Sequence, residues 1–244
     1  MGPLTAAVLL DAWERGQTQL PGERAIALLV AGGISPVEAE ACPLGQRDRL
    51  LVALRERLFG SRLVALAECP GCGEALEADF DTTAVRALAA ETPGEGPFHV
   101  NWGGYRVDFR LPTTADVLAA SSAGADGRDA AAILFDRCVD RAEHDGMTVA
   151  PAQLPDTCRA EVAAAMAALD PQAEIDVALS CPRCGQTTRA AFDITTFLWQ
   201  EIGAWTRRTL AEVHTLAAAY GWPEADILGL NPWRRQRYLE LVTA

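Results

Sequence analysis

Apolar residues recur at helical spacing through the first sixty residues of the chain. Glycines and prolines divide this region into four predicted helices: residues 5–15, a helix from Glu23 to the Gly32–Gly33 pair, a short helix from Pro36, and about residues 44–59. In the fourth helix, leucines fall on one face and arginines, including Arg55, on the other, so we expect the arginines to face solvent. Residues 1–60 are therefore predicted to form a helical N-terminal segment.

The pattern changes to alternation after Gly60, and the same change occurs again about a hundred residues later. Two series of apolar residues occupy alternate positions: Leu63, Ala65 and Ala67, and then Ile175, Val177 and Leu179. Each series leads into CPxCG, a second strand-like stretch and an Asp-x-Thr that can start a helix. Identical residues recur 112 positions apart beyond the cysteines: Ala78 and Ala190, Phe80 and Phe192, Asp81 and Asp193, Thr83 and Thr195. The repeat predicts two facing hairpins, residues 61–83 and 173–196, as the halves of a zinc ribbon.

The segment between the two halves, residues 84–172, carries structural signals of its own. Alternating apolar residues flank the Gly103–Gly104 pair, which predicts a hairpin over residues 98–110. Helical spacing then predicts three helices, at about residues 114–121, 128–143 and 156–169. We therefore expect an inserted α+β unit rather than a linker.

The last part of the chain, residues 197–244, is predicted to be a helical C-terminal segment. An apolar stripe at helical spacing runs from about Thr196 to Tyr220, and Trp222–Pro223 and Asn231–Pro232 begin two shorter helices. The predicted class is therefore α+β. A zinc-ribbon-like β core from two CPxCG hairpins is joined by a helical N-terminal segment, an α+β insertion and a helical C-terminal segment.

Two CxxC pairs are the clearest chemical signal in the sequence. A thiolate pair separated by two residues can hold one side of a metal ion, and two pairs complete the tetrahedron of sulfur that structural Zn²⁺ prefers. A closed four-thiolate site has no open coordination position, so its predicted role is structural rather than catalytic. The sequence predicts one structural zinc ion bound by Cys69, Cys72, Cys181 and Cys184.

Two other interpretations of these cysteines remain open. A cytosolic CxxC can be a redox pair, although thioredoxin-like motifs occur once and lack a second copy with matching flanks. Disulfides are the other alternative, which the lack of a recognisable secretory signal disfavours. Three further cysteines stand alone among apolar residues, and we expect buried free thiols at Cys42, Cys138 and Cys158.

The net charge of −12 falls within residues 1–200, because acidic residues and arginines balance from Glu201 onward. Zinc ribbons often bind nucleic acid, but this requires a basic surface that displaces counterions from phosphates. The knuckle regions offer Arg183 and Arg189 and no aromatic stacking platform. A zinc-ribbon nucleic-acid-binding regulator is therefore the alternative function, and nucleic acid is a disfavoured partner. No apolar run approaches the roughly 20 residues of a membrane span, and we expect a cytoplasmic location.

Motifs of catalysis are absent from the sequence. It contains no nucleophile elbow, P-loop, dinucleotide-binding glycine turn or HExxH, so we predict that the protein is not an enzyme. The C-terminal segment instead concentrates tryptophan and arginine, which are enriched at protein interfaces. Core packing is the other interpretation of the tryptophans. The predicted interface residues are Trp205, Trp222, Trp233, Arg234, Arg235 and Tyr238.

Several stretches together resemble a known family: PLGQRDRLLVALRERLFG at 43–60, the paired CPxCG knuckles, FDITTFLWQEIGAW at 192–205, and EVHTLAAAYGWPEADILGLNPWRRQRYLELV at 212–242. They are similar to the T4-like phage baseplate protein family and to proteins encoded in phage tail and contractile injection system clusters. The resemblance covers both ends and the knuckles, and residues 84–172 are less diagnostic. The stretch VHTLAAAYGWPEADIL also resembles small tail-assembly proteins.

The resemblance implies a non-enzymatic protein that is built into the baseplate of a contractile tail-like particle or helps to build it. The implied partners are other baseplate, tube or sheath subunits of such a particle. The implied location is the cytoplasm or the assembled phage-tail-like particle.

Overall fold

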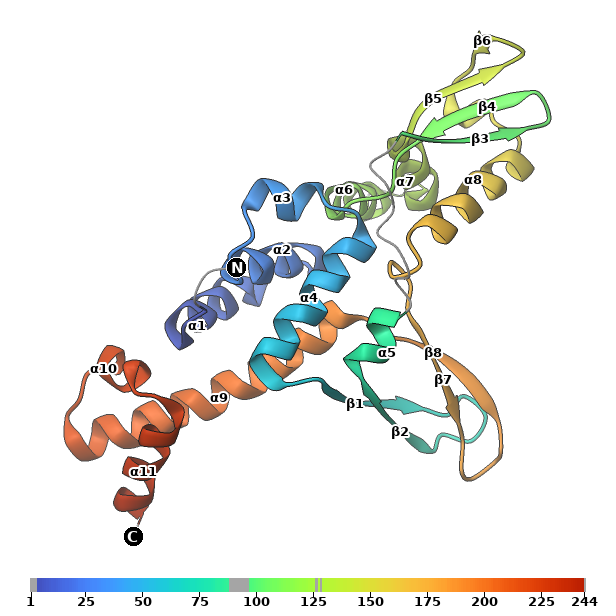
Figure 1. The fold of residues 1–244 in the computed structure, drawn as a ribbon. Coiled ribbons are helices and arrows are strands. Elements are labelled where there is room, and N and C mark those ends of the chain that lie inside the picture. Colours follow the sequence, from blue (N-terminus) through green and yellow to red (C-terminus); the bar gives the residue numbers. More distant parts are fainter. Residues whose placement is uncertain (1–3, 88–96, 126, 128, 244) are drawn as a thin grey trace. The chain divides into compact units, whose positions relative to one another are not determined.

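The computed structural model describes residues 4–87, 97–125, 127 and 129–243, and it confirms the mixed α+β class (Figure 1). The chain divides into two compact units, Met1–Ser35 with Thr195–Ala244, and Pro36–Ile194. Parts of the predicted N-terminal segment and insertion, residues 1–3 and 88–96, lie outside the described residues.

The first unit is helical and combines both ends of the chain. Its elements are α1 (Ala6–Arg15), the 3₁₀ turn η1 (Gly16–Thr18), α2 (Pro21–Ala31), α9 (Ile194–Tyr220, from Thr195), α10 (Glu224–Gly229) and α11 (Pro232–Thr243). Trp199 of α9 fixes this packing, because a Cβ on Gly16 would lie 2.2 Å from its ring. Arg24 of α2 stacks over the same ring at 4.8 Å and donates to the Gly16 carbonyl oxygen at 2.9 Å.

The second unit begins with α3 (Pro36–Ala41) and α4 (Leu44–Phe59). Leu51, Val52 and Leu54 form the buried face of α4. Arg55, which the sequence pattern placed in solvent, is only 3% exposed, so that expectation is wrong. Its guanidinium donates to the Gly60 carbonyl oxygen at 2.5 Å, where the helix ends and carbonyl groups lack helical partners.

Two separate hairpins follow the same plan: β1 (Arg62–Glu68) with β2 (Ala75–Asp81), and β7 (Asp176–Ser180) with β8 (Thr187–Ala191). The two hairpins lie next to each other in Figure 1. Their registers are equivalent, since Ala65 pairs with Ala78 in one and Val177 with Ala190 in the other. The next helices, α5 (Thr82–Ala87) and α9, also begin 112 residues apart. The repeat seen in the sequence is therefore a repeat of structure.

The chain between the hairpins forms a four-stranded sheet with helices. The elements are β3 (Phe98–Trp102), β4 (Tyr105–Phe109), α6 (Thr114–Ala125), α7 (Ala130–Cys138), β5 (Val139–His144), β6 (Met147–Thr148), the 3₁₀ turn η2 (Pro151–Gln153) and α8 (Asp156–Leu169). The strand order is β3-β4-β5-β6, and Val107, Phe109, Cys158 and Val162 are among its core residues.

The predicted helix over residues 128–143 is wrong in its second half, because α7 ends at Cys138 and the chain continues as β5. Val139 pairs with Phe109 and Ala142 with Val107, so both side chains enter the core beneath the sheet. Pairing with the edge of β4 makes residues 139–144 a strand, although their apolar residues have helical spacing.

The insertion is fastened to the beginning of α4. Pro43 forms a β-bridge with Thr113, and the Leu44 N–H donates to the Pro112 carbonyl oxygen at 3.0 Å. At the other end of the insertion, Asp170 accepts a hydrogen bond from the Gly45 N–H. Both ends of the inserted segment thus meet the helix that leads into the first knuckle.

Candidate metal centre

The first knuckle is a tight turn between β1 and β2 that carries Cys69 and Cys72. The Cys69 N–H donates to the Glu74 carbonyl oxygen at 2.8 Å, and the Gly73 N–H donates to the Cys69 carbonyl oxygen at 2.9 Å. Gly73 has a φ of +71°, a conformation that glycine adopts without steric cost. This turn accounts for the glycine that closes the phrase CPGCG.

The second knuckle, between β7 and β8, has the same hydrogen bonds. The Cys181 N–H donates to the Gln186 carbonyl oxygen at 2.9 Å, and the Gly185 N–H donates to the Cys181 carbonyl oxygen at 3.0 Å. The φ of Gly185 is +73°, close to the φ of +71° at Gly73 in the first knuckle. The two CPxCG phrases therefore fold into equivalent turns.

The structure brings the four knuckle sulfurs together. All four Sγ atoms lie within 4.8 Å of one another, although the two pairs are more than a hundred residues apart in sequence. The shortest approaches cross between the knuckles: Cys69 to Cys184 at 3.7 Å, and Cys72 to Cys181 at 3.6 Å. The cysteines are free thiols, since a disulfide would need sulfurs about 2.05 Å apart.

These distances fit a tetrahedral metal ion. With Zn–S bonds of about 2.3 Å, neighbouring sulfurs of a tetrahedron are about 3.8 Å apart, close to the two crossing distances. The four thiols make a soft donor set that suits Zn²⁺ or iron, and neither carboxylate nor imidazole belongs to it. The arrangement is compatible with one metal ion held by all four predicted cysteines.

Backbone N–H groups around the site favour the thiolate form that a metal requires. The N–H groups of Cys184 and Arg183 face the Cys181 sulfur and lower the pKa of this thiol to about 7. The Glu74 N–H contacts the Cys72 sulfur and the Gln186 N–H contacts the Cys184 sulfur in the same way, but burial and the neighbouring sulfurs outweigh these contacts and raise the pKa of both thiols.

The two hairpins share a small apolar core beside the sulfurs. Leu76, Ala78 and Leu179 are buried there together with Cys69 and Cys181. Phe80 and Phe192, which occupy equivalent positions in the repeat, meet edge to face with ring centroids 5.3 Å apart and planes at 86°. The cluster joins the halves even before a metal is considered, and it excludes water from one side of the sulfur tetrahedron.

Two further contacts run from each knuckle to the other, one an ion pair and one a close approach of a side chain to a glycine, and the sequence pattern did not predict them. Glu74 of the first knuckle reaches Arg183 of the second at 3.4 Å. Its equivalent, Gln186, extends over Gly71, where a Cβ would lie 2.0 Å from the amide oxygen. Gly71 and Arg183 also occupy equivalent positions in the repeat. The repeat in the sequence therefore contained the information that each of these contacts joins one knuckle to the other.

The three lone cysteines are buried free thiols, as predicted. Cys42, Cys138 and Cys158 are 5%, 1% and 0% exposed. Burial raises the pKa of the Cys138 thiol to about 11, which makes it a poor nucleophile.

The residues predicted as a C-terminal interface differ in their environments within the first unit. Trp222 and Tyr238 meet edge to face at 4.8 Å and pack on the core of Val213, Leu216 and Ile227. Trp205 is half-buried, whereas Arg234 is exposed and Trp233 is 68% exposed.

Arg235 is the member of this set that the structure places inside the fold. It is only 7% exposed, and its Nε donates to Glu212 of α9 at 2.7 Å. Arg235 therefore ties α11 to α9, and among the predicted interface residues Trp233 and Arg234 are the most open to another molecule.

A buried carboxylate in the insertion, paired with two partly exposed arginines, was not anticipated from the sequence. Asp116, 1% exposed, receives hydrogen bonds from Arg110 at 2.6 and 2.9 Å and from Arg137 at 2.9 Å. Although burial opposes it, the Arg110 guanidinium holds the pKa of Asp116 well below its usual range. These partners are too far apart in sequence for a local pattern, and the cluster is a structural anchor of α6 and α7.

None of the helices in the described part of the chain combines the length and the apolar character needed to cross a membrane. The family described as T4 bacteriophage base plate protein matches residues 9–199. This match extends from α1 through both knuckles into α9 and covers most of the chain, so the protein belongs to that family. Comparison with curated proteins and with solved structures gave no match.

Proposed function

We propose that the protein is a non-enzymatic structural or assembly component of the baseplate of a phage-tail-like contractile injection particle, stabilised by one structural zinc ion. The observation that carries the proposal is membership of the base plate family across residues 9–199. The same match includes both CPxCG phrases, so the cysteine cluster lies within the family region.

Zinc is the metal that the donor set favours, with Cys69, Cys72, Cys181 and Cys184 as its ligands. A closed tetrathiolate site binds no substrate, and its free energy of binding acts as folding free energy, on the order of 10 kcal/mol at neutral pH. In this protein the ion would hold two distant hairpins as one zinc-ribbon-like core. We also propose the domain organisation predicted from the sequence: a helical N-terminal segment, two halves of a zinc ribbon with an α+β unit inserted between them, and a helical C-terminal segment.

The acidic surroundings of the knuckles support a protein partner rather than a nucleic acid. Arg183 lies 3.4 Å from Glu74, and Arg189 lies 3.8 Å from Asp176. Both arginines that flank the second knuckle are thus near carboxylates, which compete with phosphates for them. We propose neighbouring baseplate, tube or sheath subunits as partners, with the exposed face of α11 as one contact surface.

Assembly of the particle tests this proposal. Deletion of residues 222–244 should abolish co-purification with sheath, tube or other baseplate proteins. Because the deletion also removes Ile227 and Tyr238 from the helical core, Trp233→Ala serves as the variant that leaves that core intact. Arg208→Ala, on the exposed side of α9, is the matched control. An intact particle assembled without this protein would contradict the proposed role.

A further inference from the structure

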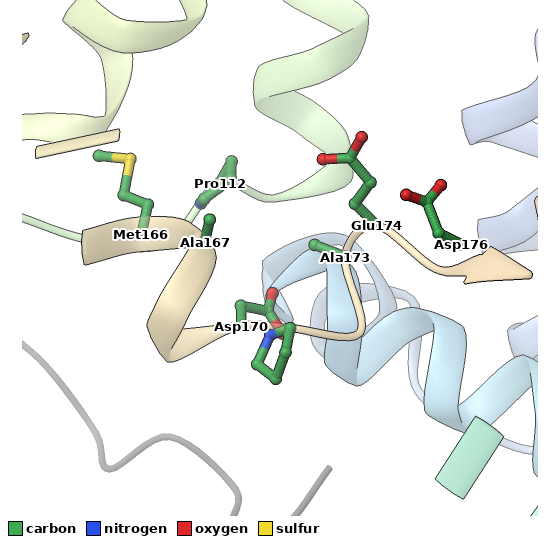
Figure 2. A pocket seen from close by; sticks show the side chains of 8 residues that line it. Pro112, Met166, Ala167, Asp170, Ala173, Glu174 and Asp176 are labelled. Atoms are coloured by element: carbon green, nitrogen blue, oxygen red, sulfur yellow. The ribbon is translucent and has the colours of Figure 1, made fainter. Parts of the chain in front are cut away.

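An open cavity of about 480 Å³ lies between the end of α8 and the start of β7 (Figure 2). Its volume falls within the range of roughly 300–1,000 Å³ in which proteins bind ligands or side chains. The lining residues are apolar or acidic: Pro112, Met166, Ala167, Asp170, Pro171, Ala173, Glu174 and Asp176. Figure 2 shows Met166, Ala167 and Pro112 on one side and Glu174 and Asp176 on the other.

The three carboxylates of this cavity differ in how far they are neutralised. Asp170 is committed to the Gly45 N–H at 2.8 Å. Asp176 faces Arg189 at 3.8 Å, with both side chains well exposed. Glu174 is exposed and has no ion pair within the described ranges. An apolar wall opposite the unpaired Glu174 and the exposed, loosely paired Asp176 suits a cationic side chain whose stem or neighbour is apolar.

The outer face of α11 has the complementary chemistry. Trp233 and Leu241 are 68% and 69% exposed, and Arg237 stacks over the Trp233 ring at 5.2 Å. Arg234 is also exposed, whereas Tyr238 and Leu239 turn toward the core. This face therefore presents the Trp233 ring and two exposed guanidinium groups, of which Arg237 also pairs with Glu240 at 2.9 Å and Arg234 has no ion pair among the described residues.

We propose that α11 of one copy docks into this cavity on a second copy, with Trp233 against the apolar wall and Arg234 and Arg237 against Glu174 and Asp176. The inference rests on the proposed role of α11 as a contact surface and names its partner. Charge supports a second copy as the occupant. The net charge of −12 lies within residues 1–200, which include the acidic cavity, whereas the outer face of α11 carries Arg234 and Arg237, so the two surfaces of this one chain have opposite charges.

The contact is heterologous, because each copy contributes α11 to one neighbour and its cavity to another. This geometry permits a charge-swap test on the full-length protein by sedimentation velocity over a concentration series. Wild-type protein should self-associate. Glu174→Arg alone and Arg234→Glu alone should each weaken association by about tenfold or more, because like charges then face one another. The control Arg208→Glu makes the same charge change on α9 and should leave association unchanged.

Mixing Glu174→Arg protein with Arg234→Glu protein should restore association, since every contact between the two different variants pairs opposite charges. A wild-type protein that stays monomeric, or a mixture that shows no rescue, overturns the inference. Mixing would also fail to restore association if α11 bound the cavity of its own copy, and that result overturns docking between copies. If the single variants still co-purify with other particle subunits while remaining monomeric, only the self-docking is overturned and the proposed baseplate role stands.

Discussion

Asp170 accepts a hydrogen bond at 2.8 Å from the backbone N–H of Gly45, a residue 125 positions earlier in the chain. Gly45 lies in the first turn of α4, where N–H groups have no helical partner. A carboxylate at this position also interacts favourably with the helix dipole. The space is closely filled, since a Cβ on Gly45 would lie 1.9 Å from Asp170 Oδ1.

We expect Gly45→Ala to lower the free energy of unfolding by about 1–3 kcal/mol, because the new methyl group displaces the capping carboxylate. Asp170→Ala should cost about 1 kcal/mol through loss of the cap. Urea denaturation measures both. Gly229→Ala is the control, since a Cβ there meets no atom within 4 Å. Equal stability of the Gly45→Ala and Gly229→Ala proteins would show that the close contact is relieved at no cost.

Stability should fall as pH rises through about 6 because of Asp48. Burial raises the pKa of this carboxyl to about 6, in spite of the neighbouring Arg47, and the carboxylates of Asp193 and Asp170 add to the effect. The folded state thus binds the proton more tightly than the unfolded state, where the pKa is near 3.8. The stabilisation is complete below about pH 4 and is lost as pH rises through the folded pKa.

Asp48→Asn should therefore raise the free energy of unfolding at neutral pH, by at most about 3 kcal/mol, and flatten its decline between about pH 4 and 7. Unfolding curves at several pH values give the difference between the two proteins. Asp79, an exposed residue whose pKa is lowered by Arg62, is the control, and Asp79→Asn should give a small change of opposite sign. A wild-type and Asp48→Asn pair with parallel pH profiles would contradict the prediction.

Replacement of one knuckle cysteine should disorder both knuckles. Cys69→Ser or Cys184→Ser removes one ligand of a shared ion, so zinc content should fall well below one per chain. Hydrogen exchange should accelerate over residues 69–74 and 181–186 together. Cys42→Ala, outside the cluster, should retain the metal. Exchange that accelerates only in the mutated knuckle would indicate two independent sites.

Phe80 and Phe192 should be energetically coupled through their edge-to-face contact. In a double-mutant cycle with alanine, the double variant should be less destabilised than the sum of the single variants by about 1 kcal/mol. Phe98, which packs in the separate core of the insertion, provides the control pair. Phe80→Ala and Phe98→Ala should be additive, and additivity of the Phe80 and Phe192 variants would refute the coupling.

Arg235 and Arg234 should respond differently to alanine although they are adjacent. Loss of the buried Arg235 breaks the 2.7 Å hydrogen bond to Glu212 and should cost about 2 kcal/mol of stability. Arg234→Ala, at an exposed position, should change stability by less than about 0.5 kcal/mol. Thermal unfolding distinguishes the two. Similar melting temperatures for both variants would mean that Arg235 is not structural.

Features with a local signal in the chain were predictable from it. The knuckles follow from glycines at positive φ beside paired cysteines, and the hairpin at Gly103–Gly104 follows from alternation around a turn. The meeting of the four sulfurs was also deducible, because two copies of one half-site are complementary to each other. The binding of a metal ion, and its identity as zinc, stay predictions.

Features that depend on a distant partner were not predictable. The segment at Val139 has helical spacing and becomes a strand only because β4 offers it a free edge. Arg55 looks like a solvent residue in the helical pattern, and only the folded chain shows that its side chain is buried and donates to the Gly60 carbonyl oxygen. Asp116 has no distinctive neighbours in the sequence, and its role arises where Arg110 and Arg137 converge.

Neither half of the repeat is complete by itself. Each half carries two thiols, one knuckle and one phenylalanine, and each needs a second half to finish both its sulfur cage and its apolar core. Two short chains with one half apiece would form the same centre as a homodimer, at a rate limited by their concentration. Because one chain carries both halves, that encounter is intramolecular, and the two halves can differ in sequence while still meeting one to one.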